Sequence, residues 1–190
     1  MKDINNKPSR LDIISAHVQA CRLPHYIEGR VIVDLVKGDV SAIVTLVGRN
    51  EAPHCIKYWF ESEIISFEQL RSVLLNMWCS AEFPCRALPR RLWLDWFRRA
   101  GYLSDESAPR PTKPTEVWRA QAGRVRGLSW TTDKDKAVWF HKRNELLRLK
   151  DPLVLRGFVQ PSGVLALTGA RNEREIVCDP AAVKLVEMAA

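Results

Sequence analysis

The feature that most constrains this chain is a proline-marked break in composition at residues 104–115, SDESAPRPTKPT. Such a stretch is typical of a linker, because proline can neither continue a helix nor pair inside a sheet. Before it, apolar residues recur at helical spacing. After it, they come in short β-branched runs separated by turns. The break predicts a mainly helical region at 1–105, a Pro-rich linker at 106–115 and a small second domain at 116–188.

Three helices are indicated in the first region. One fits residues 11–21. A second begins after Ser66, a suitable N-cap, because the apolar residues that follow it lie at i, i+3 and i+4 spacing. The third opens at Pro89 and ends at Gly101.

Residues 30–36 and 40–47 are ambiguous. Their β-branched residues favour strands, which could complete the sheet of the second domain. Helices are favoured slightly, because the apolar residues of the first segment share a helical face and Asp39 suits the N-cap of a helix that stops at Gly48.

The second domain has one predicted helix, capped by Asp133 and ended by Pro152. A helix among several short strands indicates an α+β fold with a mostly antiparallel sheet. The predicted strands are 116–120, 127–131, 153–159, 164–168, 175–178 and 183–186.

The net charge of +7 and the pI of about 9.4 suggest a polyanionic partner. The densest basic cluster lies on the helix after Pro89. It is either a solvated helix face or a contact surface for nucleic acid or an acidic partner. Its members are Arg90, Arg91, Arg98 and Arg99.

Several classes are excluded by the same sequence. Apolar runs such as residues 42–47 are far shorter than the roughly 20 residues of a membrane span, and the N-terminus has no signal-peptide pattern. We therefore expect a cytoplasmic protein with no membrane partner. The five cysteines contain no C-x-x-C pair and the four histidines are scattered, so we expect reduced thiols and no metal site.

Three pieces of the second domain stand out together. Arg119 lies among apolar residues of a predicted strand, Ser129-Trp130-Thr131 precedes the predicted helix, and Glu173 and Glu175 lie at a strand entrance. Residues two apart in an extended segment share a face, so the two carboxylates would point the same way. Each piece alone is common in ordinary domains, and it is their joint order that favours a functional interpretation.

That order resembles the ADP-ribosyltransferase-like superfamily, over about residues 113–188. Its members bind NAD in a cleft between two small sheets. Their signature is a strand Arg or His, then a serine or aromatic motif followed by a helix, then a strand led by E-x-E. Here only 10 residues separate Arg119 from Ser129. That interval is nearer the branch with an aromatic second motif, which would put Trp130 in that place. The whole chain also looks like uncharacterised phage or prophage proteins with this C-terminal half.

The resemblance implies a mono-ADP-ribosyltransferase, a glycosyltransferase that uses NAD to modify a protein side chain or nucleic acid as an intracellular effector. Cleavage of the nicotinamide bond passes through an oxocarbenium-like state, which a carboxylate stabilises. Glu175 would supply that carboxylate, and Glu173 would orient the accepting side chain. The expected NAD-binding residues are Arg119 for phosphate or ribose oxygens, Ser129 and Thr131 for the ribose, Trp130 or Phe140 for the nicotinamide ring, and Arg124 and Arg126 for the pyrophosphate.

The alternative is a non-catalytic module of the same fold, whose basic helix grips nucleic acid or an acidic protein. A pure binding module would have no need for Glu173 and Glu175 in a cleft with Arg119.

Overall fold

The computed structural model describes residues 7–105, 107–123 and 126–189. The chain divides into two compact units, Met1–Leu88 and Pro89–Ala190. The first is helical and the second is built on a seven-stranded sheet, so the predicted α+β class is confirmed. Across the described ranges, no helix has both the length and the apolar character needed to cross a membrane.

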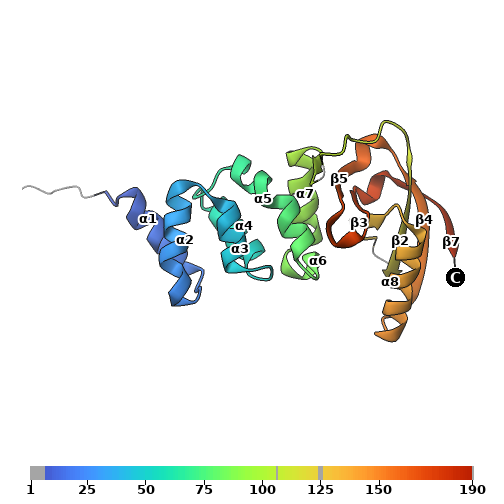
Figure 1. Ribbon diagram of the computed structural model, residues 1–190, viewed down its shortest axis with the longest axis horizontal. Helices are drawn as coiled ribbons and strands as arrows, with labels where there is room; N and C mark the ends of the chain where they lie inside the picture. The colour runs from blue at the N-terminus through green and yellow to red at the C-terminus, as the bar shows by residue number, and fades with distance from the viewer. Residues whose placement is uncertain (1–6, 106, 124–125, 190) are drawn as a thin grey trace, which may run out of the picture. The chain divides into compact units, whose positions relative to one another are not determined.

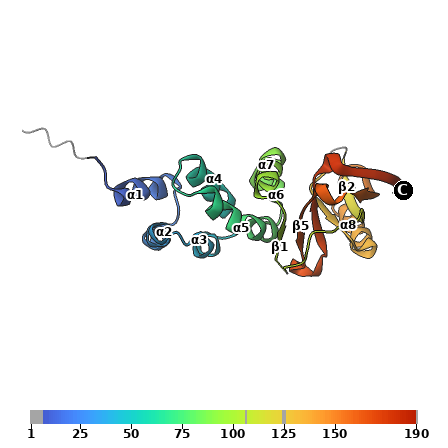
Figure 2. The same cartoon turned by 90° about the horizontal axis from the view of Figure 1, so that it is seen from above.

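The first unit is a set of helices around an apolar core (Figures 1 and 2). Helices α2, α3 and α5 pack in succession, and α4 packs on α3 and α5. The core includes Trp59, whose indole N–H donates to the carbonyl of His17 at 3.3 Å. The helices are α1 (Arg10–Ala20), α2 (His25–Lys37), α3 (Val40–Val47), α4 (Ala52–Glu61), α5 (Phe67–Ser80) and α6 (Pro84–Ala87).

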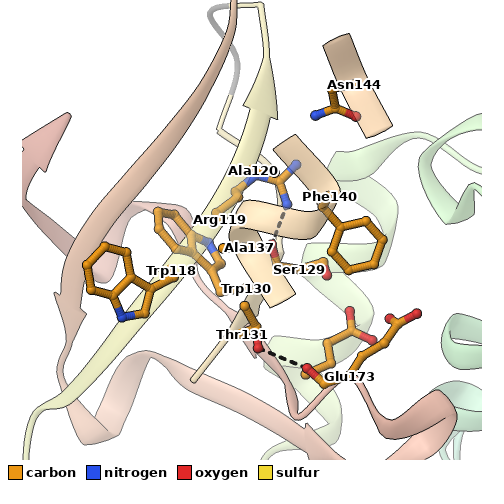
Figure 3. Close-up of a pocket in the computed structure, with 11 residues that line it drawn as sticks. Trp118, Arg119, Ala120, Ser129, Trp130, Thr131, Ala137, Phe140, Asn144 and Glu173 are labelled. Carbon is orange, nitrogen blue, oxygen red and sulfur yellow. Dashed lines mark hydrogen bonds between the residues drawn. The ribbon is translucent and has the colours of Figure 1, made fainter. Parts of the chain in front are cut away.

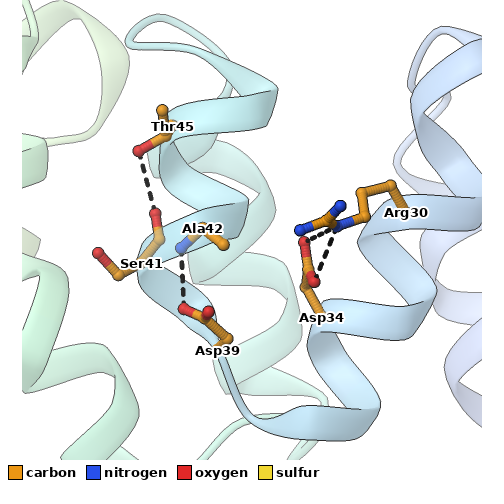
Figure 4. Close-up of polar contacts among 6 residues, drawn as sticks. All are labelled: Arg30, Asp34, Asp39, Ser41, Ala42 and Thr45. Carbon is orange, nitrogen blue, oxygen red and sulfur yellow. Dashed lines mark hydrogen bonds and ion pairs between the residues drawn. The ribbon is translucent and has the colours of Figure 1, made fainter.

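Both ambiguous segments are helical, and local contacts explain why (Figure 4). Gly38 ends α2 with φ of 76°, in the left-handed region that glycine adopts without strain. Asp39 then caps α3, because its carboxylate accepts from the backbone N–H of Ala42 at 3.0 Å. On α2, buried Asp34 pairs with Arg30 at 2.9 Å. The strand alternative, in which these segments completed the sheet, is wrong.

The predicted helices at 11–21, after Ser66 and after Pro89 are present, but α4 and α6 were not predicted. Ser66 forms a capping box with Gln69. Signals for α4 exist in the sequence: Pro53 lies in its first turn, and Ile56 and Trp59 recur at helical spacing.

The second unit contains one mixed sheet of order β1-β5-β6-β3-β2-β4-β7. Among the described strands, β1 pairs with β5 in parallel and the other neighbours are antiparallel. Helix α8 packs against β2, β3 and β4 (Figure 1). The elements are α7 (Arg90–Ala100), β1 (Leu103–Ser104), β2 (Thr115–Ala122), β3 (Ser129–Thr131), α8 (Lys134–Leu146), β4 (Pro152–Val159), β5 (Val164–Thr168), β6 (Glu175–Cys178) and β7 (Val183–Ala189).

The expected boundary at 105 differs from this arrangement, because the division falls between Leu88 and Pro89. The segment predicted as a linker is attached to the sheet of the second unit. β1 extends the sheet, and the guanidinium of Arg110 donates to the carbonyls of Val164 at 2.7 Å and Ser162 at 2.9 Å. Arg110, between two of the three prolines, therefore anchors this segment at the start of β5.

The sheet is weakly joined at its centre. β2 pairs with β4 along its whole length, from Thr115 opposite Val159 to Ala122 opposite Pro152. In the described residues, β2 and β3 pair at one position alone, Trp118 opposite Thr131. Beyond that pair no further ladder hydrogen bonding joins the described residues of the two strands. We call this place, bounded by residues 118–120 and 129–131, the seam.

Candidate functional site

A pocket of about 140 Å³ lies at the seam (Figure 3). Segments far apart in the sequence line it: β2, β3, α8 and the approach to β6. The pocket is lined by both residues predicted to be catalytic. It is also lined by five of the seven residues predicted to bind NAD. These are Arg119, Ser129, Trp130, Thr131, Phe140, Glu173 and Glu175.

The guanidinium of Arg119 lies inside the seam. Its Nη1 donates to the carbonyl of Ser129, so the side chain occupies space where a ladder between β2 and β3 would otherwise continue. Gly127 makes room for it, since a Cβ there would come within 2.3 Å of Nη2 of Arg119. The pocket thus has a cation held at one wall by a backbone carbonyl.

The two aromatic candidates differ in burial. Trp130 is 2% exposed, belongs to the apolar core and donates its indole N–H to the carbonyl of Gly127 at 3.2 Å. Phe140 is half-buried on α8, and its ring meets that of Trp139 edge-on, with centroids 4.9 Å apart. Phe140 is therefore the more accessible of the two rings that line the pocket, whereas most of Trp130 lies in the core.

Glu173 and Glu175 reach the same pocket by a different geometry from the expected one. The prediction of an extended segment is wrong for Glu173, which ends the 3-10 turn Ala170–Asn172 with φ of −94° and ψ of −10°. Arg174 follows with φ of 45°, and Glu175 then opens β6. Arg174 lines a different pocket. A sharp turn between the two glutamates, rather than strand alternation, brings both to one pocket.

Hydrogen bonds hold this turn at both ends. The hydroxyl of Thr131 donates to the carbonyl of Glu173 at 2.9 Å (Figure 3). At the start of the turn, the carboxylate of Asp105 accepts from the hydroxyl of Thr168 and from the N–H of Gly169 at 3.2 Å. Glu175 itself is 5% exposed and pairs in register with Thr131. The carboxylates are therefore carried by an ordered turn.

Two further pockets adjoin the first through shared lining residues. One, of about 360 Å³, shares Phe140 and Glu173 and is also lined by the exposed Trp139. The other, of about 290 Å³, shares Glu175 and includes Arg174. The site is thus a chain of small pockets that meet at the two glutamates.

Some lining residues were missed by the sequence analysis. Trp118 and Ala120 flank Arg119 on β2, and Ala137 and Asn144 lie on α8. Helical spacing could have identified the last two, because residues 137, 140 and 144 follow one another at i, i+3 and i+7.

Four residues expected to contact a partner or nucleic acid, Arg90, Arg91, Arg98 and Arg99, are exposed on α7. Arg91 pairs with Asp95 on the same helix at 3.8 Å, and two others contact more distant parts of the second unit. Arg98 pairs with Asp179 at 2.6 Å, and Arg90 donates to the carbonyl of Arg126.

Arg126, expected at the pyrophosphate, does not line the seam pocket and donates to the carbonyl of Val183 at 3.1 Å. Arg124, also expected there, lies outside the described residues. The five cysteines are reduced thiols, and no group of three potential ligands that could hold a metal occurs in the described part of the chain. Burial raises the pKa of the Cys178 thiol, which keeps it protonated and unreactive.

Comparison of the chain with protein-family models, with curated proteins and with solved structures finds no match. The functional argument therefore depends on the site itself: one guanidinium, two hydroxyls, an accessible aromatic ring and two carboxylates around one small pocket.

Proposed function

We propose that the second unit is an NAD-dependent mono-ADP-ribosyltransferase that acts on a macromolecule. The observation that carries the proposal is the convergence of Arg119, Ser129, Thr131, Glu173 and Glu175 on one pocket at the seam. These residues come from three separate segments, and ordinary core packing would not require two carboxylates and a guanidinium to meet there.

The lining residues fit the chemistry of NAD. A planar guanidinium suits phosphate or ribose oxygens, the hydroxyls suit the ribose, and the half-buried Phe140 ring suits a flat aromatic leaving group. At about 140 Å³ the seam pocket is smaller than a typical pocket for a whole ligand, so it would take one end of NAD, with the adjoining pockets available to the rest.

In the proposed reaction the bond between nicotinamide and the ribose breaks and a bond from the ribose to the acceptor forms. Nicotinamide leaves with the bonding electrons, and the acceptor loses a proton. Positive charge develops on the ribose, and a carboxylate fixed beside it lowers the barrier. Glu175 suits this role because it is buried on a strand end, and Glu173 faces both the seam pocket and the adjoining one, where an acceptor would enter.

The test is incubation of the full chain with NAD labelled on the adenylate half, together with cell lysate. We expect nicotinamide release and transfer of label to a macromolecule. A chain that releases no nicotinamide with any extract would rule the proposal out.

The alternative of a nucleic-acid-binding module is less well supported by the basic helix. Arg98 is ion-paired with Asp179, and the guanidinium of Arg90 donates a hydrogen bond to the carbonyl of Arg126, so a polyanion would have to displace contacts that already exist.

Gly127 offers a test of Arg119 that leaves the guanidinium in the protein. In Gly127→Ala, the new methyl group would overlap the end of the Arg119 side chain, which is flexible and can move away. We expect NAD affinity to fall by about tenfold to a hundredfold, the range for losing a charge-assisted hydrogen bond. Isothermal titration with NAD measures this change.

The matched control is Gly29→Ala on α2, where a Cβ meets nothing within 4 Å. It should leave NAD affinity unchanged and slightly raise stability, because alanine is the better helix former. Equal NAD affinity in the two variants would show that the position of the Arg119 guanidinium is not used in binding.

A further inference from the structure

Leucines project into solvent where α8 ends and the chain turns into β4. Leu146 is 84% exposed, Leu147 is 56% and Leu149 is 40%. We call residues 142–151 the α8 tip. Single exposed leucines are ordinary, but three within four positions place an unusual amount of apolar surface at one helix end, and exposed apolar surface of this kind marks interaction sites.

The leucines are held on an ordered turn. The N–H of Arg148 donates to the carbonyl of Glu145 at 2.9 Å, and that of Leu149 to the carbonyl of Asn144 at 3.0 Å. Together these bonds make a Schellman ending, with Arg148 in the left-handed conformation at φ of 51°. In such endings the residue in the place of Leu149 often packs on an apolar side chain one turn back, but here that place is occupied by Asn144. The local sequence therefore leaves Leu149 exposed.

Charge surrounds the apolar side chains. The α8 tip contains four cations and two carboxylates, and Lys142, Arg148 and Lys150 are exposed beside the leucines. A nucleic acid would use the cations but not the leucines. Exposed leucines with cations beside them suit a bilayer with acidic headgroups, which is anionic at its surface and apolar beneath it.

The directions of the leucines distinguish a bilayer from a protein groove. Leu146 is the last residue of α8 and Leu147 is its C-cap, so the two side chains point about 100° apart around the axis, and Leu149 lies beyond the helix end. They therefore radiate from a helix end instead of forming the i, i+3, i+7 stripe that a groove accepts. A fluid phase accommodates side chains that point in several directions.

We propose that the α8 tip is a reversible contact for an anionic membrane surface, with the leucines entering the headgroup boundary and the cations pairing with lipid headgroups. This departs from the expectation of no membrane partner, which depended on the absence of a spanning segment. The proposal is independent of NAD chemistry, since nicotinamide release is measured without lipid.

Flotation of the full chain with vesicles tests the contact. We expect binding to phosphatidylcholine vesicles that contain phosphatidylserine, weak binding to phosphatidylcholine alone, and release as salt is raised. Leu146→Ser with Leu147→Ser should weaken binding by about tenfold or more, because both side chains would lose apolar contact with lipid.

Arg148→Gly separates charge from folding. Glycine relieves the left-handed strain, so the thermal midpoint should rise, while loss of the cation should weaken vesicle binding by about fivefold. The control is Val33→Ser with Val36→Ser, which removes exposed apolar side chains from α2 and should leave binding unchanged.

The proposal is overturned if the wild-type chain does not float with anionic vesicles. It is also overturned if the variants of the α8 tip float with these vesicles as well as the wild-type chain does. Equal loss in the α2 control would also overturn it, as would capture of the tip by an acidic protein without any affinity for vesicles.

Discussion

Replacing Glu175 by glutamine should reduce nicotinamide release by about 100-fold to 1,000-fold, the usual cost of removing one group that stabilises transition-state charge. Glutamine has nearly the same shape as glutamate but carries no charge. Glu175 is 5% exposed at the start of β6, where little water reaches it to replace the lost charge. Release of nicotinamide from NAD under single-turnover conditions measures the chemical step directly.

The matched control is Glu116→Gln on β2. The carboxylate of Glu116 accepts from Arg156 at 2.7 Å on a partly exposed face, and the residue does not line the seam pocket. We expect full activity and a stability loss below about 1 kcal/mol, as for other solvent-screened ion pairs. If both variants keep wild-type activity and a wild-type thermal midpoint, Glu175 is not the catalytic carboxylate.

Elements whose ends are encoded by adjacent residues could be predicted from the sequence. Ser66 and Asp133 were assigned as helix caps, and each caps its helix through its own side chain. The strands after Pro152 were assigned from turn residues and β-branched runs, and β4, β5, β6 and β7 lie at those positions. The ends of these elements could be predicted because the contacts that fix them join residues only a few positions apart in the sequence.

Features set by contacts between distant segments could not be predicted. The segment at 106–115 has the composition of a linker, yet Arg110 fastens it to β5 some 50 residues later, through carbonyls that any sequence would present. Prolines indicate that the segment is neither helix nor inner strand. They do not indicate which part of the protein the segment packs against.

Predicting the candidate site required both local residue chemistry and contacts between distant segments. The residue types in Arg119, Ser129 and the two glutamates identified the chemistry, and the structure brings them to one pocket. The route differs from the expected one, because Glu173 arrives on a turn with left-handed residues at Asn172 and Arg174. Asparagine is one of the residues that adopt this backbone readily, but arginine is not, so the sequence carried a signal for the first of the two positions and none for the second.

Substitution of Trp130 is expected to have the second large effect. It distinguishes a role of Trp130 in the core from a role in binding NAD. Trp130→Ala should lower the free energy of unfolding by about 3–5 kcal/mol, because the indole is almost fully buried and its removal leaves a cavity among Val117, Leu155 and Ile176. The lost indole N–H would also leave the carbonyl of Gly127 without its partner at 3.2 Å. Urea unfolding followed by circular dichroism measures this loss.

Trp139→Ala is the control, since its side chain is 55% exposed and its recorded ring contact is with Phe140. That variant should lose less than about 1 kcal/mol. A small stability loss in Trp130→Ala together with lost NAD binding would contradict the core assignment and make Trp130 the nicotinamide-stacking ring. The expected result assigns stacking to Phe140, because a side chain that is packed in the apolar core cannot also move to accept a ligand ring.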